Sequence, residues 1–218
     1  MGNFVKYLKL AGNFLLDLLY PPKCPACDKI VKSGLCDECK VVFEDLYKPH
    51  LLSIGGYVDA CYYFFSYRNS IIKEMLIRAK SQGEKNTVNT IGDFYARFIN
   101  ETGSMKNADV ITFCTRRKMQ KRRTGIDQSE LIAKRISLLT GIKCKKLLKR
   151  KGFIRKQHVL NYERRWKNVK NSFVALPFEE KTILLIDDIC TTGATVNEAA
   201  RTLKKAGAKR VYVLSFAH

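Results

Sequence analysis

The C-terminal stretch, residues 182–217, constrains the fold most strongly. An apolar run that begins at Ile183 ends at two adjacent acids, and a short loop then leads into an amphipathic segment. Gly207 ends that segment, and a second apolar run begins at Val211. This order of strand, loop, helix and strand predicts a parallel βαβ unit.

The loop of this unit has the composition of an anion site. Ligands of parallel βαβ units bind where the strand meets the helix, because backbone N–H groups are unpaired there and the helix dipole favours an anion. Threonine hydroxyls add donors, and a glycine allows a phosphate to approach the backbone closely. The alternative is a solvated turn in which a threonine caps the helix. The expected anion site comprises Thr191, Thr192, Gly193, Ala194 and Thr195.

The two acids before the loop, Asp187 and Asp188, narrow the ligand class. Two carboxylates beside a phosphate are unfavourable unless sugar hydroxyls, a divalent cation or both require them. A phosphorylated ribose with a metal ion meets this condition.

The run IDDICTTGAT resembles the phosphoribosyl-pyrophosphate (PRPP) motif of type I phosphoribosyltransferases. The resemblance implies that Asp187 and Asp188 hold the ribose 2′ and 3′ hydroxyls and would orient the ribose in catalysis. It also implies that residues 191–195 cradle the 5′-phosphate, and that Mg²⁺ accompanies PRPP.

Four of the eight cysteines form two C-x-x-C pairs that are separated by eight residues. Such pairs bring four thiolates to one tetrahedral zinc ion, which would be structural and would supply folding energy to a short segment. Disulfides need an oxidising compartment, and no secretory signal is evident. Redox chemistry at one pair would leave the second unexplained. The predicted zinc ligands are Cys24, Cys27, Cys36 and Cys39.

The other four cysteines lie in apolar settings that are typical of a protein core. Cys190 lies within the expected phosphate loop, where exposure and thiol reactivity are the alternative to burial. The remaining three are Cys61, Cys114 and Cys144.

The chain is strongly basic, with a formal net charge of +20 from 40 Lys and Arg against 20 Asp and Glu. This charge favours a polyanionic partner such as nucleic acid, or an anionic membrane surface; the alternative is a charge that only maintains solubility. A basic loop follows a predicted buried strand at 108–114, at the edge of the sheet where the PRPP loop lies. Its cations would attract pyrophosphate or a nucleic-acid backbone, unless the loop is merely solvated. They are Arg116, Arg117, Lys118, Lys121, Arg122 and Arg123.

Periodicity predicts the remaining elements. Strands are expected within 57–67 and at 144–148, helices at 69–79, 88–100 and 129–139, and a polar turn at 80–85. Asp127 is a candidate cap of the third helix. The predicted fold is an α/β, type I phosphoribosyltransferase-like parallel sheet flanked by helices, with a small N-terminal zinc-ribbon module that four cysteines hold together.

Three parts are expected along the chain. Residues 1–20 form an amphipathic helix, residues 21–45 a four-cysteine zinc-binding module, and residues 50–218 the phosphoribosyltransferase-like domain. The first part is too short and too often interrupted by charge to span a bilayer, so it packs on the main domain, docks on a partner or lies on a membrane.

The order of parts resembles the ComF family, phosphoribosyltransferase-like proteins that are associated with DNA uptake in naturally competent bacteria. The resemblance rests on Leu-Leu-Tyr-Pro-Pro-Lys-Cys-Pro-Ala-Cys, the second C-x-x-C, a basic loop that ends in Gly-x-Asp-Gln, and the C-terminal PRPP motif. Family members usually carry a Val-Pro-Val-Pro-like loop, which in transferases helps to bind pyrophosphate, and then Arg-Gly-Phe-Asn-Gln. Here the corresponding residues are Phe113-Cys114-Thr115 and Thr124-Gly125-Ile126-Asp127-Gln128.

The predicted function is therefore that of a PRPP-binding protein of DNA uptake and natural transformation, which binds single-stranded DNA through its basic surfaces. One alternative is an active phosphoribosyltransferase that transfers phosphoribosyl from PRPP to a nitrogen acceptor. Another is an adaptor whose zinc module recruits a protein of the competence machinery and whose ligand site is vestigial. The expected location is the cytoplasm or the inner face of the membrane, without a transmembrane segment.

Overall fold

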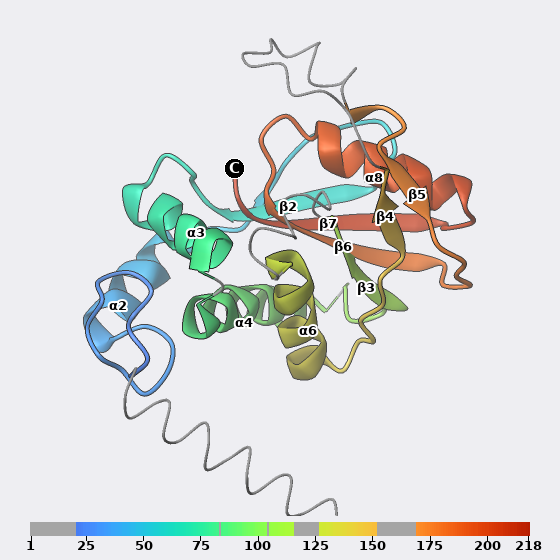
Figure 1. The fold of residues 1–218 in the computed structure, drawn as a ribbon. Coiled ribbons are helices and arrows are strands. Elements are labelled where there is room, and N and C mark those ends of the chain that lie inside the picture. Colours follow the sequence, from blue (N-terminus) through green and yellow to red (C-terminus); the bar gives the residue numbers. More distant parts are fainter. Residues whose placement is uncertain (1–20, 83, 104, 116–126, 152–168) are drawn as a thin grey trace, which may run out of the picture.

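The computed structural model describes residues 21–82, 84–103, 105–115, 127–151 and 169–218 (Figure 1). The predicted N-terminal helix and the predicted basic loop, with Arg116, Arg117, Lys118, Lys121, Arg122 and Arg123, lie outside the described residues. No helix in the described part of the chain is long and apolar enough to cross a membrane.

A five-stranded sheet with the order β1-β2-β7-β6-β3 forms the centre of the fold (Figure 1). Strands β2, β7, β6 and β3 run parallel, and the short β1 is an antiparallel edge strand. This mostly parallel sheet confirms the predicted fold class. The strands are β1 (His50–Leu51), β2 (Ala60–Phe65), β3 (Val110–Phe113), β6 (Thr182–Ile189) and β7 (Arg210–Ala217).

The predicted βαβ unit is confirmed as β6, α8 (Ala194–Lys205) and β7. Strand β6 is longer than the apolar run, because its pairing with β7 continues to the Ile189–Ala217 partners. Asp187 and Asp188 are therefore residues of the strand end itself. The apolar run is buried on both sheet faces, as expected for a central parallel strand.

Each face of the sheet is covered by a separate apolar cluster. Leu184 of β6 belongs to the cluster under α3 (Ser70–Gln82), α4 (Lys85–Thr102) and α6 (Gln128–Thr140). Leu185 faces the other cluster, which α8 covers together with a hairpin of β4 (Leu148–Arg150) and β5 (Phe173–Ala175) (Figure 1). The alternation of neighbouring strand residues between the two faces accounts for this division.

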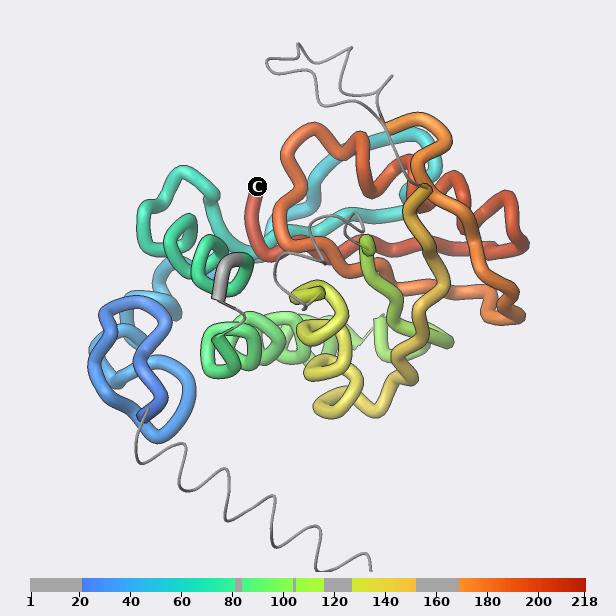
Figure 2. The backbone as a smooth tube through the Cα atoms, viewed as in Figure 1, coloured from blue at the N-terminus to red at the C-terminus, as the bar shows by residue number. Residues whose placement is uncertain are grey.

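The N-terminal ribbon and its helix α2 (Asp37–Leu46) lie beside α3 and α4 (Figure 2). Phe43 of α2 is 1% exposed, and its ring lies 5.8 Å from that of Phe94 and 5.6 Å from that of Phe65, between ring centroids. Buried aromatic pairs of this kind contribute area and pairing energy. The ribbon therefore shares a core with the sheet.

Three local predictions differ from the structure. The expected turn at 80–85 is largely helical, because α3 continues to Gln82 and α4 already begins at Lys85. The strand expected at 144–148 begins only at Leu148, as β4, and Cys144 makes an isolated bridge to Ile111. Residues 145–146 are both exposed and 147–148 both buried, which breaks the alternation of a strand. Asp127 is the N-cap of α6, but its side chain makes no capping hydrogen bond.

Candidate functional site

A polar pocket of about 400 Å³ opens at the carboxyl ends of β3 and β6. This is the sheet edge at which parallel α/β folds bind ligands. Its lining combines two acids, two cations, hydroxyls and one thiol: Lys80, Cys114, Thr115, Ser129, Arg150, Asp187, Asp188, Ile189 and Thr195.

The backbone holds the acid pair in place at the end of β6. The amide of Asp188 donates to Oδ1 of Asp187 at 3.2 Å, and the amide of Ile189 donates to Oδ1 of Asp188 at 2.9 Å. From α4, the buried Tyr95 hydroxyl donates to the carbonyl oxygen of Asp187 at 2.6 Å. Both carboxylates line the pocket although neighbouring strand residues normally point apart.

Two cations face the acids. Nζ of Lys80, in the last turn of α3, lies 2.9 Å from Oδ2 of Asp188, and Arg150 of β4 lines the same pocket. Burial and then the neighbouring charge of Asp188 raise the pKa of Asp187 to about 8, while Lys80 and Arg150 act in the opposite direction. At neutral pH the acid pair therefore offers both hydrogen-bond acceptors and a proton, which suits hydroxyl ligands.

Gly193 fixes the loop that connects the acids to α8. It is the N-cap of α8 with a φ of 72°, and a Cβ at this position would lie 2.5 Å from Cγ2 of Ile54. Its carbonyl accepts a hydrogen bond from the Asn197 amide at 2.8 Å. The position thus requires glycine both for its left-handed backbone and for the close approach of Ile54. Thr192 accepts only a long bond, 3.4 Å, from the Ala194 amide.

The structure brings part of the predicted PRPP site together. Asp187, Asp188 and Thr195 line one pocket. Residues 191–194 form the adjoining loop but do not line that pocket; Thr191 is exposed, whereas Gly193 and Ala194 are buried.

The predicted core cysteines are buried at three positions and half-buried at Cys144. Cys190, for which exposure was the alternative, is only 2% exposed. Its amide donates to the Ala217 carbonyl at 3.0 Å, which draws the residue against the end of β7.

Six of the nine pocket residues were not among the predicted site residues: Lys80, Cys114, Thr115, Ser129, Arg150 and Ile189. Lys80 was expected in the polar turn at 80–85, and Arg150 was counted only in the net positive charge of the chain. The available signal for Thr115 and Ser129 was their place after a buried strand and at the start of a helix. Thr115 is 4% exposed, and no hydrogen-bond partner of its hydroxyl is found among the described residues.

The four predicted zinc ligands converge at the other end of the molecule. The sulfur atoms of Cys24, Cys27, Cys36 and Cys39 all lie within 4.8 Å of one another, and those of Cys27 and Cys36 are 3.5 Å apart. Tetrahedral Zn–S bonds of about 2.3 Å place sulfurs about 3.8 Å apart. The sulfur positions therefore fit a zinc ion.

The backbone also favours metal binding at Cys24. Burial by itself raises the pKa of this thiol, but backbone hydrogen bonds from Cys36, Ala26 and Cys27 outweigh it and lower the pKa to about 7. The Cys36 amide, for example, donates to Cys24 Sγ at 3.4 Å. Since the thiolate is the metal ligand, these bonds favour the metal-binding form of Cys24.

Comparison with known families gives two matches on this chain. Residues 145–217 match the phosphoribosyl transferase domain, and residues 15–50 match the double zinc ribbon domain. The fold and its two sites thus define a phosphoribosyltransferase-like protein with an N-terminal zinc ribbon.

Two curated relatives are similar to part of the chain. The DNA utilization protein YhgH of Escherichia coli is 34% identical over 95 residues, which cover 42% of this chain and 41% of that protein. Competence protein F of Haemophilus influenzae is 30% identical over 100 residues, 44% of each chain. The match thus spans about two fifths of the length of these relatives. These matches to proteins named for DNA utilization and competence support the resemblance to the ComF family that the order of the motifs indicated.

Among solved structures, adenine phosphoribosyltransferase from Leishmania tarentolae is similar with a TM-score of 0.40 and 16% identity, over 76% of this chain and 79% of that chain.

Proposed function

We propose that this protein binds PRPP in the pocket at the end of β6 and acts in DNA uptake. One observation carries the ligand assignment. An acid pair, held by the backbone of a parallel strand, shares a pocket of about 400 Å³ with a threonine of the following helix. A ribose that carries phosphate groups matches this combination of hydroxyl acceptors and anion donors.

The proposed roles follow the chemistry of each group. Asp187 and Asp188 accept the ribose hydroxyls, and the loop at 191–195 binds the 5′-phosphate at the start of α8. Arg150 faces the pyrophosphate, with which Mg²⁺ would be bound as the neutralising cation. We assign the roles of the phosphoribosyl domain to residues 50–218 and those of the zinc module to residues 21–45.

The proposed role in DNA uptake rests on the relatives and on charge. Relatives carry the names DNA utilization protein and competence protein, and the net charge of this chain is +20. The phosphates of single-stranded DNA would bind to exposed cations. In the described residues, such cations gather before, within and just after β4, at Lys143, Lys146, Lys149 and Lys151.

An active phosphoribosyltransferase is the second candidate, and the cations of the pocket favour it. Lys80 and Arg150 stand opposite the acids, so one pocket contains groups for both the ribose and a leaving pyrophosphate. Such a site would act by positioning and by electrostatic stabilisation of the separating charges. A nitrogen acceptor that consumes PRPP in the presence of the protein would support this candidate.

The test of the proposed ligand is calorimetric titration of the zinc-loaded full chain with PRPP and Mg²⁺. We expect binding by the wild type and loss of binding in Asp187→Asn/Asp188→Asn. Asp45→Asn/Glu179→Gln, at two exposed acids away from the pocket, provides a control for the loss of acidic groups. Absence of binding by folded wild-type protein would overturn the proposal.

The test of the nucleic-acid proposal is fluorescence anisotropy with labelled single-stranded DNA at several salt concentrations. We expect an affinity that falls steeply as salt rises, because phosphate contacts release counterions. Lys146→Gln/Lys149→Gln is expected to reduce the salt dependence. DNA binding that is undetectable even at low salt would contradict this part of the function.

A further inference from the structure

Helix α3 contacts the zinc ribbon and the acid pair with two side chains that lie two residues apart. Arg78 donates from Nη1 and Nη2 to the two carboxylate oxygens of Asp28 in the ribbon, at 2.5 and 2.8 Å. Lys80 reaches Oδ2 of Asp188 at 2.9 Å. Positions two apart on an α-helix are separated by about 200°. The helix therefore stands between the two sites and contacts one with each face.

The contact with the ribbon is well defined. The Arg78 side chain is only 19% exposed, and Glu74, one turn earlier, accepts from its Nε at 3.3 Å. Asp28 follows the zinc ligand Cys27 directly and has a φ of 64°, so its carboxylate is placed by the first turn of the ribbon. A paired, bidentate arginine holds this geometry more firmly than a single surface ion pair does.

The contact with the pocket is anchored as well. The Lys80 carbonyl accepts a hydrogen bond of 2.6 Å from Nε2 of Gln128, which is 2% exposed and begins α6. The Lys80 ammonium lies in the pocket, beside two carboxylates that repel each other. The Lys80 ammonium, 2.9 Å from Oδ2, holds the Asp188 carboxylate in place as a hydroxyl acceptor.

We propose that α3 couples the zinc ribbon to the phosphoribosyl pocket, with Lys80 as a positioning residue for Asp188 and the Arg78–Asp28 pair as the anchor of the helix. The coupling rests on the proposed function, because its readout is PRPP affinity. A ribbon that releases Asp28 would let the end of α3 shift and withdraw Lys80 from the acid pair. By reciprocity, PRPP in the pocket would strengthen the contact of α3 with the ribbon.

The simpler interpretation is that these are two unrelated surface ion pairs, which are usually worth little. The two interpretations differ in whether the effects of the two ion pairs on PRPP affinity add. Unrelated pairs contribute independently to PRPP affinity, whereas an anchor that acts through Lys80 has no effect once Lys80 is neutral.

The experiment is a titration of zinc-loaded variants with PRPP and Mg²⁺. Lys80→Met should bind about tenfold or more weakly, and Arg78→Gln about three- to tenfold more weakly, within the usual range of coupling between sites. The double variant Arg78→Gln/Lys80→Met should bind no more weakly than Lys80→Met.

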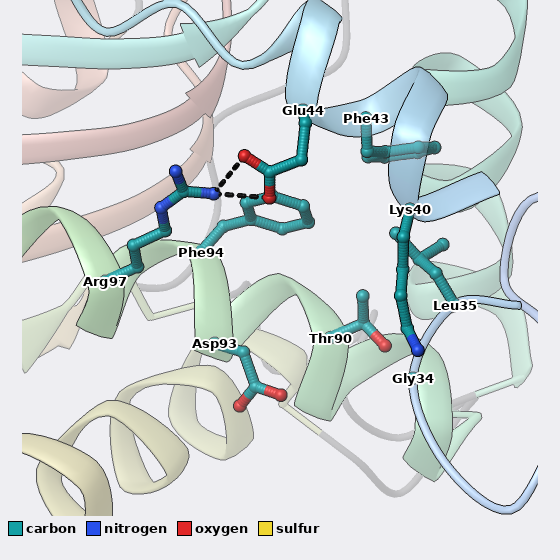
Figure 3. Close-up of a pocket in the computed structure, with 9 residues that line it drawn as sticks. All are labelled: Gly34, Leu35, Lys40, Phe43, Glu44, Thr90, Asp93, Phe94 and Arg97. Carbon is teal, nitrogen blue, oxygen red and sulfur yellow. Dashed lines mark hydrogen bonds and ion pairs between the residues drawn. The ribbon is translucent and has the colours of Figure 1, made fainter. Parts of the chain in front are cut away.

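Arg97→Gln is the matched control. Arg97 also joins the ribbon helix to the main domain, since its Nη1 donates to both carboxylate oxygens of Glu44 at 2.6 and 2.7 Å (Figure 3). It extends from α4, however, and has no contact with the acid pair among the interactions described. We expect its PRPP affinity to stay within about twofold of wild type.

Three results would overturn the coupling: wild-type affinity in Arg78→Gln, additive losses in the double variant, or an equal loss in Arg97→Gln. Wild-type protein that binds no PRPP would overturn the proposed function itself, which distinguishes the two failures. Zinc content and thermal midpoint report whether Arg78→Gln is folded. If Arg78→Gln is not folded, the isosteric Asp28→Asn removes the same ion pair. The PRPP affinity of Asp28→Asn is then judged by the same three results.

Discussion

The hydroxyl of Tyr95 donates a hydrogen bond of 2.6 Å to the backbone carbonyl oxygen of Asp187. The tyrosine is fully buried on α4, and burial, followed by the nearby carboxylates, holds its pKa well above the usual value. The hydroxyl is therefore a permanent donor at physiological pH. It ties the middle of α4 to the strand end that carries the acid pair.

Removal of this hydroxyl should loosen the strand end. In Tyr95→Phe the Asp187 carbonyl loses its donor, and a lost buried hydrogen bond lowers the free energy of unfolding by about 1 to 2 kcal/mol. Urea denaturation measures this change. Tyr57→Phe, at a position that is 40% exposed, is the control and should have no effect. Equal stability of Tyr95→Phe and wild type would mean that the bond makes no net contribution.

The raised pKa of Asp187 predicts that stability depends on pH. The pKa is about 8 in the folded protein and about 4 in the unfolded chain, so the folded state binds more protons between these values. The free energy of unfolding should therefore fall as pH rises from about 4 to about 8. Asp187→Asn removes this effect.

Thermal midpoints of Asp187→Asn and wild type should be close near pH 4 and diverge toward pH 8, where the variant is the more stable. A difference that does not change with pH would contradict the assignment. Gain of stability with loss of the proposed ligand is the usual trade-off at a binding site.

The backbone of Gly193 predicts a graded response to substitution. Gly193→Ala puts an alanine where the backbone is left-handed and places its Cβ 2.5 Å from Cγ2 of Ile54. We therefore expect the free energy of unfolding to fall by about 1 to 3 kcal/mol. Gly141→Ala is the matched control, because Gly141 has a φ of 76° and open space around the added atom. It should lose only the cost of the backbone conformation, about 1 kcal/mol.

Addition of Ile54→Ala to Gly193→Ala should recover the steric part of the loss. Chemical denaturation of the three variants separates the two contributions. Equal losses in Gly193→Ala and Gly141→Ala would show that Ile54 moves aside without cost.

The motifs that were predicted from sequence are those whose residues are neighbours along the chain. The acid pair and its glycine loop form one segment, and the two C-x-x-C pairs lie close enough to identify a zinc site. Lys80 and Arg150 could not be assigned, because each enters the pocket through tertiary contacts: the packing of α3 against the strand ends, and the pairing of β4 with β5. Periodicity indicates which face of an element is buried but not which distant loop it meets.

Zinc removal should destabilise more than the ribbon. The metal holds the segment that carries α2, and Phe43 of that helix packs against Phe65 of β2 and Phe94 of α4. When the ribbon unfolds, this aromatic core becomes accessible to water. Exposure of one buried phenylalanine lowers the free energy of unfolding by about 2 to 3 kcal/mol. Chelation, or Cys39→Ser, should therefore lower the thermal midpoint of the whole protein and increase the binding of a hydrophobic dye. Cys144→Ser, a half-buried cysteine away from the ribbon, is the control and should retain its zinc. A protein that loses zinc with an unchanged thermal midpoint would show instead that the sheet and its helices are stable without Phe43, and that the shared core is not a shared folding unit.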